Sequence, residues 1–87
     1  MNLTDIINHI EEIEKLIFDF NIKEAMQQFA KLTEVLIQVS GNLPPSELAE
    51  LFLIIKELNA ALLNKDYLLL NDILEYELKP FTETNLS

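Results

Sequence analysis

The sequence predicts an all-α protein, an antiparallel four-helix bundle built from two αα-hairpins. Apolar residues recur three and four positions apart through most of the chain, which places them on one face of each helix. Turn and capping residues divide this pattern into four segments, with breaks near residues 19–21, 40–45 and 64–66. The connections alternate short, long and short, as expected for two hairpins joined by a loop.

The first hairpin is expected to contain helices at about residues 5–18 and 22–39. Thr4 is the expected N-cap of the first helix. Asn21 followed by Glu24 gives the second helix a capping-box-like start. The predicted apolar stripes are Leu3, Ile6, Ile10, Ile13, Ile17 and Phe20 on the first helix, and Ile22, Ala25, Phe29, Leu32, Leu36 and Val39 on the second.

The second hairpin is expected to contain helices at about residues 46–63 and 67–78. Gly41 suits the position that follows the end of the preceding helix. Pro45 is tolerated in the first turn of the third helix, and Asp66 is the expected N-cap of the fourth. The predicted apolar face of the third helix consists of Leu48, Leu51, Phe52, Ile55, Leu58 and Leu62.

Pro80 is expected to stop the fourth helix, because a proline removes a backbone donor. The sequence therefore predicts a single helical domain at residues 1–80 and a flexible C-terminal tail at residues 81–87. A chain of 87 residues and 10.0 kDa has room for one small core. A core of this size gains stability from a second copy, so we expect homodimerisation to complete the bundle.

Composition excludes several classes of protein. The net charge is −9 and 49% of residues are hydrophobic, which is too apolar for a disordered acidic tail. Six scattered lysines and no arginine make no basic stripe, so nucleic-acid binding is not expected. The absence of cysteine excludes disulfides and thiolate metal sites. The longest apolar run, at residues 51–55, is far too short to span a membrane, and no targeting segment is visible. We expect a cytoplasmic protein.

Three polar residues fall inside predicted apolar faces, namely Glu14, Asn59 and Glu77. Together with His9 they could form a small polar site, because a buried carboxylate must find a partner or become neutral. The alternative is that both glutamates turn out to water while Asn59 makes a hydrogen bond in the core. No metal site or cofactor is expected, since the only histidine lacks the Glu-x-x-His spacing of bundle metal sites. No nucleophile is placed with a base, so an enzyme is not expected.

Leu53, Ile54 and Leu68 are apolar residues outside the predicted apolar faces. A helix that is apolar nearly all round is either central in the fold or covered by another chain. We therefore predict that these three residues form an interface, with the alternative that the third helix is simply the most buried one. The acidic residues on the polar faces are either an ordinary solvated surface or a rim that orients a basic partner.

The segment NKDYLLLNDILEYELKP, at residues 64–80, resembles the helix–turn–helix endings of small bacterial helical proteins of unknown function. The same turn occurs in tetratricopeptide-type hairpins, although the rest of that repeat pattern is absent. The overall build, small and acidic with two hairpins, is similar to flagellar and secretion chaperones. This similarity concerns the fold and transfers no residue roles.

The sequence thus predicts a non-catalytic protein-interaction module that uses an apolar helix face with an acidic rim. The partner would be another protein or a second copy of the chain. The alternative hypothesis is a chaperone-like or regulatory adaptor that holds an amphipathic helix of a client protein.

Overall fold

A computed structural model describes residues 3–86, and this part of the chain is helical and contains no strand, which confirms the predicted all-α class. Helix α1 spans Leu3–Phe18, α2 spans Ile22–Ser40 and α3 spans Pro45–Leu63. A fourth helical run comprises α4 (Tyr67–Ile73), the π-helical turn η1 (Leu74–Leu78) and α5 (Lys79–Asn85). The first two residues of the predicted domain and the last residue of the predicted tail lie outside the described residues.

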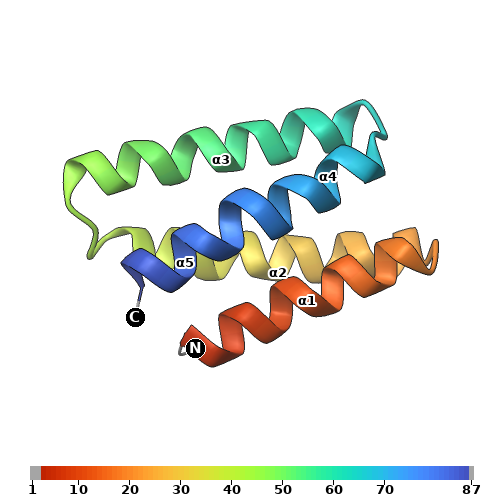
Figure 1. The fold of residues 1–87 in the computed structure, drawn as a ribbon, viewed down its shortest axis with the longest axis horizontal. Coiled ribbons are helices and arrows are strands. Elements are labelled where there is room, and N and C mark those ends of the chain that lie inside the picture. The colour runs from red at the N-terminus through yellow and green to blue at the C-terminus, as the bar shows by residue number, and fades with distance from the viewer. Residues whose placement is uncertain (1–2, 87) are drawn as a thin grey trace.

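The four helical runs lie side by side around one core (Figure 1). Helix α1 packs along α2 and also against α4, η1 and α5, while α3 packs mainly against α4 and η1. Helices α2 and α3 make few contacts with each other. Both chain ends and the α2–α3 connection lie at one end of the molecule, and the two short turns lie at the other (Figure 1).

The predicted stripes of α1 and α2 are buried along the middle of each helix, whereas Phe20, predicted to end the first stripe, is 84% exposed in the turn after α1. Helix α1 buries four isoleucines at alternating spacings of four, three and four, and α2 follows the same rule with spacings of four, three and four. The buried residues are Ile6, Ile10, Ile13 and Ile17 on α1, and Ala25, Phe29, Leu32 and Leu36 on α2. This alternation keeps side chains on one face of a helix with 3.6 residues per turn.

The turn between α1 and α2 contains a residue in the left-handed backbone conformation. Phe20 has φ 58°. The amide of Asn21 donates to the carbonyl of Leu16 at 2.8 Å, the six-to-one hydrogen bond of a Schellman motif. Asn21 then begins α2 without a capping hydrogen bond from its side chain, which instead donates to Glu24 at 2.9 Å.

The turn between α3 and α4 has the same backbone conformation. Lys65 has φ 53°, and the amide of Asp66 donates to the carbonyl of Ala61 at 2.9 Å. The side chain of Asp66 accepts from the amide of Leu69 at 3.1 Å, so Asp66 caps α4 as the sequence predicts. The two short turns therefore match in conformation although their sequences differ.

The buried face of α3 differs from the predicted one. Helix α3 buries Leu51, Ile54, Leu58 and Ala61, whereas Phe52 is 51% exposed. Ile54 is 5% exposed, so its predicted place outside the buried face of α3 is wrong. The physical reason is that α3 is apolar on most of its circumference. Its packing against α4 and η1 selects the buried stripe, and no break in the sequence pattern marks it.

The fourth helical run buries residues at a constant spacing of four. Leu70, Leu74, Leu78 and Thr82 are all 0% exposed. In a regular α-helix each step of four residues rotates the side chain by about 40°, so this row would turn away from the core. The π turn η1 has more residues per turn and reduces that rotation. The π turn is therefore what keeps the whole row in the core.

The prediction that Pro80 stops the helix is wrong, because α5 continues to Asn85. Pro80 lies in the first turn of α5, directly after η1. Tyr76, four residues earlier, lies in the π turn, where carbonyls accept from the amide five residues on. The amide of Lys79 donates to the carbonyl of Leu74, so the hydrogen-bond register has already shifted by one residue just before the position where proline lacks an amide. Phe81 and Thr82, which the sequence assigns to a flexible tail, are buried in the core.

Candidate functional site

A groove of about 650 Å³ runs between α3 and the η1–α5 segment, and we refer to it as the α3–α5 groove. Helix α3 supplies one wall, and η1 and α5 supply the other. The residues that line it are Ser46, Glu47, Glu50, Leu53, Ile54, Glu57, Tyr76, Glu77, Pro80, Phe81, Thr84 and Asn85. Its size is within the range of binding clefts for small ligands or for the anchor residues of a peptide.

The charges in the α3–α5 groove are all negative. Glu47, Glu50 and Glu57 follow one edge of α3, and Glu77 faces them from η1. None of the described residues that line the groove is basic. Four carboxylates around one cleft favour a cationic ligand, because low-dielectric walls strengthen their field.

Glu57 and Glu77 form a carboxyl pair across the groove. Burial raises the pKa of Glu77, and the neighbouring Glu57 raises it further through a side-chain hydrogen bond and its charge. Two carboxyls this close favour a shared proton over two negative charges. A cationic group placed between them would replace that proton.

Apolar side chains provide the rest of the groove surface. Ile54 and Phe81 are core residues that reach the groove, so they form its floor. Leu53 and Tyr76 lie at its sides and are mostly exposed. The groove thus combines an apolar floor with a carboxylate rim.

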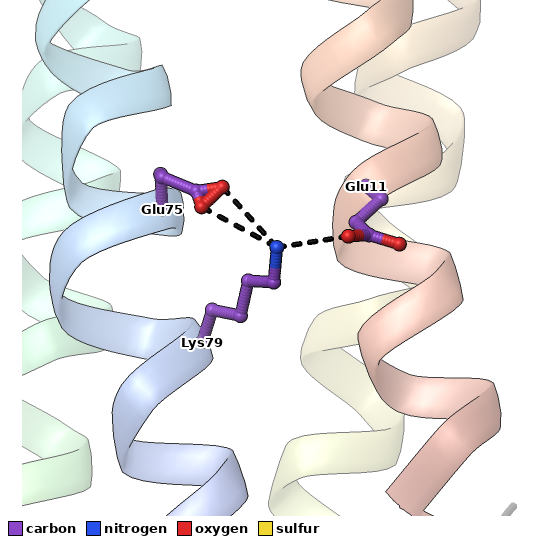
Figure 2. Close-up of polar contacts among 3 residues, drawn as sticks. All are labelled: Glu11, Glu75 and Lys79. Carbon is purple, nitrogen blue, oxygen red and sulfur yellow. Dashed lines mark hydrogen bonds and ion pairs between the residues drawn. The ribbon is translucent and has the colours of Figure 1, made fainter.

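The π turn places its polar residues on two sides of the fourth helical run. Tyr76 and Glu77 line the α3–α5 groove, whereas Glu75 points to α1. Figure 2 shows the Nζ of Lys79 between the carboxylates of Glu75 and Glu11. The Nζ–oxygen distances are 2.8 Å to Glu11 and 3.2 and 3.3 Å to Glu75. A π turn within an α-helix is often found at a functional site.

Glu14 lies beside this ion-pair cluster on α1. Burial raises its pKa to about 7, and the negative charges of Glu75 and Glu11 add to that rise while Lys79 opposes it. The backbone carbonyl of Glu14 accepts from Nδ2 of Asn71 at 3.2 Å. The carboxyl of Glu14 is therefore partly protonated near neutral pH.

The structure does not assemble the predicted polar site. Glu14 lies beside the ion pairs that Lys79 makes, and Glu77 faces Glu57 of α3. Asn59 is exposed on α3. The alternative of a core hydrogen bond from Asn59 is also wrong, since the residue is exposed. His9 pairs with Gln28, whose Oε1 is 3.1 Å from its Nε2. Within residues 3–86, no group of three His, Cys, Asp or Glu side chains is arranged to hold a metal ion.

Of the predicted interface residues, Leu53 lines the α3–α5 groove, whereas Leu68 is exposed in the first turn of α4. Sequence reasoning missed Tyr76 and Phe81. The signal available in the sequence is the row of leucines at a constant spacing of four, Leu70, Leu74 and Leu78, which continues to the buried Thr82.

Comparisons with models of protein families, with curated proteins and with solved structures gave no match to this chain. In the described part of the chain, no helix has both the length and the apolar character needed to cross a membrane.

Proposed function

We propose that this protein is a non-catalytic protein-interaction module, and that the α3–α5 groove binds a basic amphipathic helix of a partner protein. The observation that carries the proposal is the combination of an apolar floor with four carboxylates and no basic side chain in the described lining. A basic amphipathic helix offers the complementary pattern, with apolar anchors along one stripe and lysine or arginine beside them.

The carboxylates would set the orientation and the rate of association. The chain carries a net charge of −9, so a cationic segment is attracted from a distance. A lysine or arginine between Glu57 and Glu77 would relieve the repulsion of this pair. We therefore expect this pair to contribute more to binding than the other rim carboxylates.

The apolar floor would supply the anchoring contact. Ile54 and Phe81 are held by the core and need little ordering on binding, which lowers the entropic cost. Leu53 and Tyr76 stand at the sides, where they can close over an apolar side chain of the partner. Aromatic side chains in this position commonly contribute strongly to interface affinity.

The test uses a fluorescently labelled helical peptide with leucine at positions i, i+3, i+4 and i+7 and lysine elsewhere. Fluorescence anisotropy is expected to show saturable binding to the whole protein and none of a peptide with glutamate in place of lysine. The Glu57→Gln/Glu77→Gln variant should bind the lysine peptide at least about tenfold more weakly, because it removes the carboxyl pair that would hold a lysine of the peptide.

The matched control is Glu12→Gln/Glu34→Gln, which replaces the same number of glutamates at exposed positions on α1 and α2 outside the groove. This control should bind almost as the unmodified protein does. Equal weakening by both double variants would mean that net charge alone attracts the peptide, and the groove proposal would then fail.

A client-holding adaptor is the second candidate, and the open groove of the single chain supports it. Such an adaptor presents its apolar surface before the client arrives. An environment-sensitive hydrophobic dye should then fluoresce with the free protein and lose that signal when the lysine peptide is added. A free protein that gives no dye signal argues against this candidate.

A further inference from the structure

The two short turns lie at one end of the molecule (Figure 1), and the residues in and beside them include four exposed apolar side chains. Phe18 and Phe20 belong to the first turn, and Leu63 and Leu68 flank the second. Their exposed fractions are 80%, 84%, 84% and 78%. We name these four residues the turn-end patch. It is separate from the α3–α5 groove, which contains none of them.

The fold itself gives no reason for a phenylalanine at position 20. Its φ of 58° lies in the left-handed region, which glycine and asparagine adopt readily and a bulky side chain does not. The side chain is 84% exposed, so the core gains nothing from it. An aromatic residue that strains its turn and contacts solvent points to a contact outside the single chain.

Charge singles out the same end of the molecule. Residues 15–24 and 63–68, which contain the two turns, carry three of the six lysines and only three of the fifteen acidic residues. They are Lys15, Lys23 and Lys65, with Asp19, Glu24 and Asp66. The rest of the chain has twelve acidic residues and three lysines. Two copies would therefore repel each other across most surfaces, and the turn end is where the charges balance.

The lysines at the turn end are available for pairing across an interface. None of Lys15, Lys23 and Lys65 makes an ion pair within residues 3–86. In a two-fold arrangement each lysine of one copy can meet an acidic residue of the other, because the same surface is used twice. A partner with a strong net charge of either sign would leave half of these groups unmatched.

We propose that the turn-end patch is the interface of a homodimer in which two copies associate end to end about a two-fold axis. The two phenylalanines alone expose about 330 Å² if each side chain has about 200 Å² of surface. A standard interface buries about 800 Å² per partner, so the two phenylalanines supply about two-fifths of the area that each copy would bury. Leu63, Leu68 and the stems of the lysines extend the apolar area around them.

Sedimentation equilibrium of the whole protein over a range of concentrations tests this proposal. The molar mass is expected to rise with concentration from 10.0 kDa towards twice that value. The Phe18→Gln/Phe20→Asn variant should raise the dimer dissociation constant at least about tenfold. Asparagine suits the left-handed conformation at position 20, so this variant keeps the turn, and circular dichroism should show unchanged helicity.

The matched control is Leu53→Gln/Tyr76→Gln, which removes two exposed apolar side chains from the α3–α5 groove. It should dimerise as the unmodified protein does. Leu63→Gln is a second probe of the patch. Leu63 is the last residue of α3, so this variant leaves the first turn unchanged.

Two results would overturn the proposal. One is a 10.0 kDa monomer at every concentration, in which case the patch serves a different partner. The other is a dimer that survives the turn variants and is lost in the groove variant. The peptide-binding assay tests the α3–α5 groove, which shares no residue with the turn-end patch, so its outcome does not depend on dimerisation through the patch.

Discussion

The Nζ atom of Lys79 lies 2.8 Å from Oε2 of Glu11, a residue 68 positions earlier in the chain (Figure 2). Lys79 also pairs with Glu75 one turn before it, so a single ammonium group joins α1 to the fourth helical run. The hydrogen bond to Glu11 is the main cause that raises the pKa of Lys79 above its usual range, and Glu75 adds to it. This lysine is therefore charged at neutral pH.

Replacement of Lys79 should destabilise the fold. In Lys79→Met the carboxylates of Glu11 and Glu75 face each other without a cation, and we expect the free energy of unfolding to fall by about 1 kcal/mol. Urea denaturation at pH 7 measures this change. Lys56→Met is the control, since Lys56 is exposed and makes no ion pair in the described part of the chain. Equal losses in both variants would show that the cluster contributes nothing.

Stability should fall as the pH rises from 4.5 to 7. Glu14 has a pKa of about 7 in the folded chain and 4.5 as its ordinary value, so in this interval the native state binds a proton that the unfolded state has lost. The stabilisation is complete below pH 4.5 and is lost as the pH passes 7. Because Glu14 is partly exposed, we expect an effect of about 1 kcal/mol.

Glu14→Gln isolates this contribution. The amide stays neutral, so urea midpoints at pH 5 and pH 8 should differ less in this variant than in the unmodified protein. The groups that face Glu14 are Glu11, Glu75 and Lys79, and they are unchanged in the comparison. Glu12→Gln, at an exposed neighbouring position, should keep the original pH dependence. An identical pH dependence in Glu14→Gln would contradict the raised pKa.

Phe81 should be essential for stability. Its side chain is in the core, and Phe81→Ala is expected to lower the free energy of unfolding by about 3–5 kcal/mol, the usual range for removal of a buried aromatic. Thermal and urea unfolding at low protein concentration measure this loss of stability. Phe18→Ala removes an exposed ring and should cost less than about 0.5 kcal/mol. Similar costs for both would favour the flexible tail that the sequence predicts.

Lys65→Gly should stabilise the protein. Lys65 has φ 53°, a conformation that costs a residue with a side chain about 1–2 kcal/mol and costs glycine little. We expect the free energy of unfolding to rise by about 1 kcal/mol. Lys31→Gly, within α2, should lower it by about 1 kcal/mol because glycine weakens a helix interior. A loss of stability at both positions would mean that the turn is not strained.

The first hairpin could be predicted closely from the sequence. Helices α1 and α2 have one apolar stripe each, so periodicity alone identifies Ile10, Ile13, Phe29 and Leu32 as core residues. The Asp66 cap was also predictable, because an aspartate after a short turn has few other roles. These features depend on neighbours within a few residues.

The α3–α5 groove could be predicted only in part. The acidic residues of α3 and the exposed Leu53 were identified as a rim and an interface residue, but Ile54 was placed on the wrong side. Glu57 and Glu77 are twenty residues apart, and no local pattern indicates that their carboxyls meet. Their proximity depends on how α3 packs against η1.

Residue spacing and local hydrogen bonds are enough to establish that this chain is helical, where its short turns lie and which faces of α1 and α2 are buried. The tertiary structure alone decided the buried face of α3, the π turn and the continuation of the helix past Pro80. An almost uniformly apolar helix has no preferred buried face of its own. Whether a proline ends a helix depends on the hydrogen-bond register of the carbonyls in the preceding turn. Both are settled only when the helices pack together.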